Sequence, residues 1–551
     1  MTQSGDTETG YRGPALFAPL QHHAFRRIWI ASIPSNFGLL INSVGAGWAM
    51  TRLTDAPEMV ALVQTALMLP YMLFAIPAGA IADTYDRRKV SLVALFMAVI
   101  FSSGLFILAW LGLLDPWLLL IMCFLNGAAN AVFGPAWMSS VSEQVPRKDL
   151  PLGIALNAMS YNIARAFGPA LGGFLVSLAG TVAAFGTNAV SYLPMIWAQL
   201  RWKRQKTEPH LPPEQIGTAI LSGLRYVGHS PQMRRTLGRT IMFGIAGASL
   251  QALLPLVANQ QLEGGASLYG LLLGMFGVGA VLGAWLVAWT REKVSLDNQI
   301  TLALLGLAVI TAGIALSHTA WLTGLLLLAG GMAWMQITNT LNISVQARAP
   351  RWVTGRASAT FQASVAGGIA LGSWLWGSVT EALSLESAIG LSALAMALVA
   401  VIGRLTPITA IDEADDTPAR MNDPDIALDL NGRSGPVIIT IEYETPPEQM
   451  QDFYKTMTHV RSIRMRNGAY GWSLSRDIAH PEKWLERFHT PTWDDYMRQR
   501  ERMTEAERQF MVTMLGIPVS VRRLLERPVG SVRGQGKDDD SRIILPFTRT
   551  N

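Results

Sequence analysis

The sequence predicts an all-α polytopic membrane protein whose twelve transmembrane helices form two six-helix halves, followed by a C-terminal soluble α+β domain. The chain is 50% hydrophobic and only 15% charged, whereas soluble proteins carry about 25% charged residues. Apolar runs long enough to cross a bilayer, about 20 residues each, recur between residues 28 and 405. Asp, Glu and Arg are concentrated after that point, which indicates a separate domain in water.

The chain begins with a segment, residues 1–27, that is expected in the cytoplasm. Its opening MTQSGDTETGYRG is polar and has no apolar core, so no cleavable signal peptide is expected. The predicted spans then fill an N-terminal half, residues 28–201, and a C-terminal half, residues 238–405. The spans are predicted at 28–51, 58–82, 88–112, 116–141, 152–178, 181–201, 238–260, 266–290, 297–317, 319–345, 354–380 and 384–405.

Basic residues predict the orientation of these spans, because Lys and Arg collect in cytoplasmic loops. With a cytoplasmic N-terminus, the inner loops hold clusters such as Arg87-Arg88-Lys89, and the short outer loops hold only Arg52. We therefore expect both termini in the cytoplasm. On this interpretation the net charge of +5 reflects the basic residues of the cytoplasmic loops, which set the orientation of the spans. No nucleic-acid partner is expected.

The longest break between spans, residues 202–237, divides them six and six and serves as a cytoplasmic linker. Its apolar residues Ile216, Ile220, Leu224 and Val227 recur at helical spacing, which predicts an amphipathic helix at the membrane surface. The two halves show a weak internal repeat, because Pro146-Arg147 and Pro350-Arg351 both follow a span and precede a helix rich in small residues. Duplicated halves around a central site are common in secondary transporters.

Residues 79–90, GAIADTYDRRKV, place charges in a short gap between two apolar spans. The spacing Gly79-x-x-x-Asp83-x-x-x-Arg87-Arg88 resembles the signature loop of the major facilitator superfamily. A glycine permits close approach of a neighbouring backbone, and an aspartate is stabilised at the N-terminal end of another helix. The resemblance implies that this helix starts near Thr354, and that Arg87 pairs with an acid at the end of span 4, here Glu143.

On this resemblance, a conformational latch comprises Gly79, Asp83, Arg87, Arg88 and Glu143. The alternative is that these charges only mark where two spans leave the membrane.

Span 5 contains the string Ala164-Arg165-Ala166-Phe167-Gly168-Pro169-Ala170-Leu171-Gly172-Gly173. It resembles the motif GxxxGPxxGG of the exporter branches of the superfamily, with Ala164 at the first glycine. Small residues let helix backbones pack closely in lipid, and span 8 has a matching series of glycines. The residues expected to form a seal between helices, or to line the transport path, are Arg165, Gly168, Pro169, Gly172 and Gly173.

Arg165 is a charge near the middle of a span, where it must face a cavity or a partner. It either meets an anionic substrate or bonds to backbone and amide groups within the seal. No carboxylate occurs at a similar depth in the predicted spans, so proton coupling is implied only by the family.

Amide side chains on otherwise apolar helices are the candidates for substrate binding. They are equally explained as hydrogen-bonding groups that hold helices together. The candidates are Asn36, Gln64, Asn126, Asn130, Gln251, Gln336, Asn339 and Asn342. A cavity with neutral amides and few charges suits bulky amphipathic compounds better than sugars or inorganic ions.

The C-terminal region comprises a polar linker, residues 406–433, a domain, residues 434–530, and a flexible tail, residues 531–551. The order of alternating and periodic segments within the domain is β-α-β-β-α-β, which predicts a ferredoxin-like sandwich. The domain resembles the antibiotic-biosynthesis-monooxygenase type, which implies pairing into dimers. Its histidines lack metal-ligand spacing and no cofactor loop is visible, so we expect no catalytic residues, cofactor or metal, and a dimerising or regulatory module.

Together, the FRRIWIASIPSNFG start, the motif loop, span 5 and the C-terminal domain resemble the transmembrane secretion effector group, which includes enterobactin exporters. The resemblance implies a multi-pass exporter in a bacterial inner membrane, acting by alternating access, coupled to protons, on a siderophore or related metabolite. Expected partners are membrane lipid, the small-molecule substrate and a second copy of the chain. The alternatives are a multidrug or lipid transporter of the same fold, and a membrane-tethered enzyme or sensor.

Overall fold

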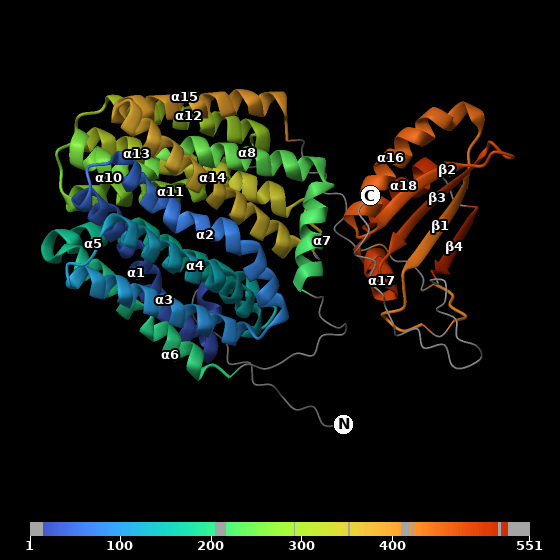
Figure 1. Ribbon diagram of the computed structural model, residues 1–551, viewed down its shortest axis with the longest axis horizontal. Coiled ribbons are helices and arrows are strands. Elements are labelled where there is room, and N and C mark those ends of the chain that lie inside the picture. The colour runs from blue at the N-terminus through green and yellow to red at the C-terminus, as the bar shows by residue number, and fades with distance from the viewer. Residues whose placement is uncertain are drawn as a thin grey trace. The chain divides into compact units, whose positions relative to one another are not determined.

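The computed structural model describes residues 15–203, 216–290, 293–350, 353–408, 419, 424–428, 430–515 and 519–526. It divides into two compact units (Figure 1). The helical unit contains Met1–Ile216, Arg235–Val345 and Ser358–Ala410, and the mixed unit contains Gly217–Arg234, Gln346–Ala357 and Ile411–Asn551. The predicted tail, residues 531–551, and parts of both predicted linkers, residues 204–215, 409–418, 420–423 and 429, lie outside the described residues.

The N-terminal half of the helical unit follows the predicted order of spans, drawn blue to green in Figure 1. Aspartates begin two of its helices, because the Asp86 carboxylate accepts from the backbone N–H groups of Arg88 and Lys89, and Asp115 accepts from that of Leu118. The elements are η1 Ala15–Gln21, α1 His23–Leu53, α2 Pro57–Thr84, α3 Arg87–Trp110, α4 Pro116–Ser140, η2 Val141–Glu143, α5 Leu150–Ser191 and α6 Leu193–Arg201.

The C-terminal half contains a helix that is broken several times where one continuous span, residues 238–260, was predicted. Pro255 lies within the broken stretch, which ends in a π-helical turn. Proline removes a backbone donor and disrupts a helix interior, which accounts for one of these breaks. The elements are α8 Pro231–Gly247, α9 Ser249–Ala252, α10 Leu254–Leu256, η3 Val257–Gln261, α11 Ala266–Thr290, α12 Leu296–Leu316, α13 Ala320–Gln346, α14 Thr354–Ala382 and α15 Leu385–Leu405.

Within the described residues, ten helices are long and apolar enough to cross a membrane, whereas twelve spans were predicted. One of the ten, Leu150–Arg201, contains both predicted spans 5 and 6, which separate at Gly180 where φ is +76°. The helix α14 corresponds to predicted span 11 and has 29 residues, but it is rich in Ser, Thr and Gly and so is less hydrophobic. The predicted polytopic helical class is confirmed.

Helices α5 and α11 bring the two halves of the helical unit together through glycines. A Cβ atom added to Gly270 would lie 2.5 Å from the Pro169 carbonyl oxygen and 2.6 Å from the Gly173 Cα. A Cβ atom on Gly173 would in turn lie 2.5 Å from the Ala266 carbonyl oxygen. The two backbones are therefore in direct contact, which small residues allow in a lipid environment.

The mixed unit contains a four-stranded antiparallel sheet in the order β2-β3-β1-β4. Its strands are β1 Val437–Glu444, β2 Tyr470–Arg476, β3 Lys483–Thr490 and β4 Ser520–Leu525. Its helical elements are α7 Ile216–Gly228, η4 Pro447–Gln449, α16 Met450–Arg466, α17 Trp493–Arg502 and α18 Glu505–Leu515. The predicted second helix of the domain is thus two helices, which separate at Met503, a residue in extended conformation.

Apolar residues of the sheet and helices form the core of this domain. Ile439 and Ile441 of β1 pack with Phe453, Met457 and Val460 of α16. These residues alternate along the strand and recur at helical spacing along the helix, as a half-buried strand and helix require. The α+β domain is confirmed, and its helices α16 and α18 cover one face of the sheet (Figure 1).

The contact between α5 and α11 generates a prediction about stability. We expect Gly270→Ala to lower the apparent melting temperature of the purified protein, because the new methyl group would meet backbone atoms that cannot move independently. Overpacking of this kind costs about 1–3 kcal/mol.

Gly306→Ala is the matched control, because no atom lies within 4 Å of a Cβ at that position in α12. Its melting temperature is expected to stay the same or rise. Equal melting temperatures for Gly270→Ala and Gly306→Ala in a thermal scan would show that the two helices are not in close contact.

Candidate functional site

The helical unit has two ends, set by the direction of its helices. The motif end is where α2 finishes and α3 begins, at Thr84 and Arg87. The far end is where α1 finishes and α2 begins, at Leu53 and Pro57.

At the motif end, Arg87 links the start of α3 to the end of α4. Its Nη1 lies 3.0 Å from Glu143 Oε1 and donates to the Ser139 carbonyl oxygen at 2.9 Å. The side chains are 24% and 15% exposed, so the pair is partly shielded from water. The ion pair implied by the family resemblance is thus present, whereas its part in a transport cycle stays a prediction.

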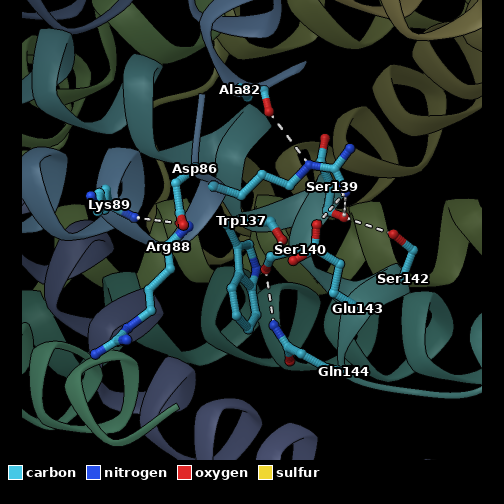
Figure 2. Close-up of polar contacts among 11 residues, drawn as sticks. Ala82, Asp86, Arg88, Lys89, Trp137, Ser139, Ser140, Ser142, Glu143 and Gln144 are labelled. Atoms are coloured by element: carbon cyan, nitrogen blue, oxygen red, sulfur yellow. Dashed lines mark hydrogen bonds and ion pairs between the residues drawn. The ribbon is translucent and has the colours of Figure 1, made fainter. Parts of the chain in front are cut away.

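Figure 2 shows the polar groups around this pair. Ser142 donates to the Ser139 carbonyl oxygen and Gln144 donates to Ser140 Oγ, so the turn that contains Glu143 is held by its own side chains. A fixed turn lets Glu143 face Arg87 without a large loss of side-chain freedom.

Two other residues of the predicted latch, Arg88 and Gly79, contact helices other than α4. Arg88 donates to the carbonyl oxygens of Gln199 and Leu200, at 2.8 and 2.7 Å, at the C-terminal end of α6. Arg88 therefore satisfies free carbonyl groups of a helix terminus, because one step along α3 turns it about 100° away from Arg87. Gly79 faces α14, since its Cβ would lie 3.9 Å from that of Ala359. The side chain of Asp83 lies outside the described part of the structure.

The C-terminal half has an ion pair of its own that sequence reasoning missed. Arg239 of α8 donates to Asp297 of α12 at 2.5 Å, and both side chains are largely buried. Arg404 of α15 lies 3.8 Å from the second oxygen of Asp297. Charge alone does not reveal that Arg239 lies inside the helix bundle, opposite an acid from another helix.

At the far end, Glu58 of α2 joins the two halves. Its Oε1 accepts from Trp374 Nε1 at 3.1 Å and from Ser378 Oγ at 3.0 Å, both on α14. Close to the same end, the rings of Trp48 and Tyr269 stack with centroids 6.4 Å apart. Sequence reasoning also missed Glu58, which stands in the first turn of α2, where an acid is expected at any helix start.

Arg165 lies between the halves, near the middle of α5. Its Nη1 is 3.9 Å from Met335 Sδ on α13, a weak hydrogen bond to an uncharged acceptor. Its own carbonyl oxygen is in contact with Gly277 of α11. The side chain is half-buried, and none of the ion pairs found among the described residues involves it. The guanidinium therefore extends from one half toward the other with its positive charge uncompensated there.

Four of the eight predicted amides bond to side chains of neighbouring helices. Asn126 donates to Ser102 at 2.6 Å, and Asn130 donates to Asn126 and to the Tyr192 hydroxyl, all within the N-terminal half. Asn36 donates to Ser160 at 3.1 Å. Gln336 donates to Thr290 and Gln299 in the C-terminal half. These contacts match the alternative in which amides hold helices together.

The remaining candidates are half-buried, namely Gln64, Gln251, Asn339 and Asn342. Asn339 is one helical turn from Met335 on α13, so it shares a helix face with the residue that Arg165 contacts. Arg165, Met335 and Asn339 are the best candidate site for a substrate between the halves.

The mixed unit connects α7 to the soluble domain. The Tyr226 hydroxyl donates to the Arg348 carbonyl oxygen at 2.9 Å, and the Arg466 guanidinium lies over the Tyr226 ring. Arg466 in turn forms an ion pair with Glu507 of α18. The predicted amphipathic helix is therefore also a connection between the segment before α14 and the soluble domain.

No group of three or more His, Cys, Asp or Glu side chains that could hold a metal ion occurs in the described ranges. His459 packs edge-on against Phe510, and His489 packs against Tyr470. These histidines take part in packing within the soluble domain.

Comparison with known proteins places these features in context. A family model described as transmembrane secretion effector matches residues 14–517. The chain is 26% identical to the multidrug efflux pump Tap of Mycobacterium tuberculosis over 73% of this chain and 96% of that protein. It is 24% identical to the enterobactin exporter EntS of Salmonella typhimurium over 70% and 93%, respectively.

Solved transporters share the fold of the helical part. A point mutant of the nucleoside transporter NupG has a TM-score of 0.58 at 12% identity and covers 69% of this chain and 99% of its own. A bacterial homologue of the lysosomal transporter Spinster has a TM-score of 0.54 at 13% identity, covering 72% and 96%.

The Arg87–Glu143 contact generates a prediction that a double-mutant cycle tests. We expect Arg87→Gln and Glu143→Gln each to lower the apparent melting temperature, and the double variant to cost less than the sum of the two. Residues in direct contact show coupling energies of about 0.5–3 kcal/mol. Lys89→Gln, at an exposed neighbour, is the control that should change little. Additive losses in the double variant would contradict the pairing.

Proposed function

The chain belongs to the transmembrane secretion effector family, whose members are transporters rather than enzymes, and on that premise we propose that it exports a small amphipathic organic compound. The proposed substrate class is a siderophore or related metabolite. The proposed mechanism is alternating access coupled to protons, in a bacterial inner membrane with both termini in the cytoplasm. Membrane lipid, the substrate and a second copy of the chain are the proposed partners.

The position of Arg165 is the observation that carries the proposal. A half-buried cation between two halves, next to the flexible thioether of Met335, favours an organic ligand with both a negative and an apolar part. Four of the eight candidate amides are bonded to neighbouring helices, which leaves few groups to recognise a sugar. An amphipathic substrate needs few such groups.

The proposal of alternating access is supported by contacts between the halves at both ends. Gly79 faces Ala359 at the motif end, and Glu58 bonds to Trp374 at the far end. Breaking one set while keeping the other would open the path to one side at a time. Glu58 is also the first residue to test for proton coupling, because it is an ionisable group at a contact between halves.

The names of the relatives support export, but they do not point to one substrate. The pump Tap is named as a multidrug efflux pump, EntS as an enterobactin exporter, and a third relative, in Staphylococcus aureus, as a staphyloferrin A transporter. The last is 20% identical over 50% of this chain and 69% of that protein. A multidrug or lipid transporter of the same fold is therefore the second candidate, favoured by the similarity to Tap.

Uptake into everted membrane vesicles tests the proposal. We expect gradient-driven accumulation of anionic siderophores, reduced roughly tenfold or more by Arg165→Gln, because loss of a charge-assisted contact to a substrate costs that much. Lys89→Gln, which removes an exposed positive charge outside the candidate site, is the matched control and should retain most activity. Glu58→Gln should remove the dependence on the proton gradient.

Two results would contradict the proposed export of an anionic compound. Accumulation of neutral or cationic dyes alone, unaffected by Arg165→Gln, would favour the multidrug alternative. No accumulation of any compound by a correctly inserted protein would reject the export function.

A further inference from the structure

We propose that the soluble C-terminal domain contains a binding site for a small organic acid, with an apolar body and an anionic group. The site is a pocket of about 230 Å³, partly open to solvent, between the sheet and helices α16, α17 and α18. It lies entirely within the mixed unit, so the inference does not depend on the proposed transport function.

The size of the cavity fits a small ligand. An engineered cavity of about 150 Å³ holds benzene, so this one has room for a fused pair of rings or a substituted ring. A ligand that fills it would stabilise the domain.

Most of the cavity wall is apolar and comes from three elements. Ile439 and Ile441 of β1, Phe488 of β3, and Met511 and Leu515 of α18 line it. Phe488 offers a ring face for stacking, and Met511 is a side chain that adapts to irregular shapes. This wall suits a flat apolar body.

The polar groups gather around Tyr496, and they are hydrogen-bond donors. Arg523 Nε of β4 and Arg500 Nη1 of α17 both donate to the Tyr496 hydroxyl oxygen, at 2.8 and 3.3 Å. The Gln499 side chain is 3% exposed, and its Nε2 has no hydrogen-bond partner within the described residues. A buried donor without a partner is costly and is expected to have a function.

The charges around the cavity are unbalanced. Arg464 is held by Glu486 at 3.1 Å, and Arg508 is held by Glu505, so these two lining arginines are neutralised. Arg523 has no ion-pair partner among the residues that the structure describes, and the lining residues include no Asp or Glu. A negative group placed near Tyr496 would therefore find a cation and an amide donor together.

A carboxylate meets these requirements. It accepts hydrogen bonds through two oxygens, so Arg523 and Gln499 can each donate to one of them. Its apolar body would then lie against Phe488 and the β1 isoleucines. A neutral amide of the same shape would lose the charge-assisted bond, and its NH₂ group would face donors.

Binding to the full-length protein in detergent tests the site, with 1-naphthoate as the probe and 1-naphthamide as its neutral analogue. We expect saturable binding of 1-naphthoate by calorimetry, at least about tenfold tighter than that of 1-naphthamide. Arg523→Gln should weaken 1-naphthoate binding by a similar factor. Arg522→Gln, on the neighbouring exposed residue of the same strand, should leave it unchanged.

A second variant keeps the test valid if Arg523→Gln unfolds the domain. Gln499→Leu removes a buried donor without a partner, so the melting temperature should hold or rise while 1-naphthoate binding weakens. Arg165→Gln should not alter this binding, which separates the site from a transport path in the helical unit. Equal binding of both probes, no binding, or binding that Arg523→Gln and Gln499→Leu leave unchanged would overturn the proposal.

Discussion

The direct contact between the backbones of α5 and α11 is the constraint on which the rest of the helical unit depends. Gly173 and Gly270 leave no room for a side chain, and Gly277 lies against the carbonyl group of Arg165. In lipid, helices gain little by burying apolar surface against each other, so close packing must come from small residues. This contact fixes the depth and direction of Arg165, because that residue is part of it. The position of the mid-membrane cation is thus a consequence of the glycines in both helices.

The two ends of the helical unit use polar contacts instead. At the motif end the Arg87–Glu143 pair holds α3 to α4 within one half, while at the far end Glu58 bonds across the halves to α14. Polar contacts near water can exchange protein partners for solvent at modest net cost. The glycine contacts in the middle of the helical unit cannot exchange their partners for solvent in this way. This division suits a molecule that pivots about its centre and opens at its ends.

The sequence predicted what depends on composition and periodicity, and missed what depends on the arrangement of distant elements. Hydropathy located the spans, and the glycine series in spans 5 and 8 predicted their contact. Arg88 was grouped with Arg87 because a motif does not show which way a helix face turns. The polar amides Asn126 and Asn130 were indistinguishable from substrate ligands until Ser102 and Tyr192 were placed beside them. The pocket of the soluble domain is built from β1, β3, β4, α16, α17 and α18, so no local sequence pattern predicts it.

The proposed alternating access requires the halves to pivot, opening one end as the other closes. Distances between spin labels test it most directly, in a Cys123→Ala background because Cys123 is the single cysteine of the chain. One pair, Lys89→Cys with Lys293→Cys, reports on the motif end, and the other, Asp55→Cys with Glu386→Cys, reports on the far end; all four positions are exposed. If the halves pivot, a change of pH, or Glu58→Gln, which removes the charge from the contact across the halves, lengthens one distance while shortening the other. Two distances that stay fixed, or that lengthen together, would contradict it.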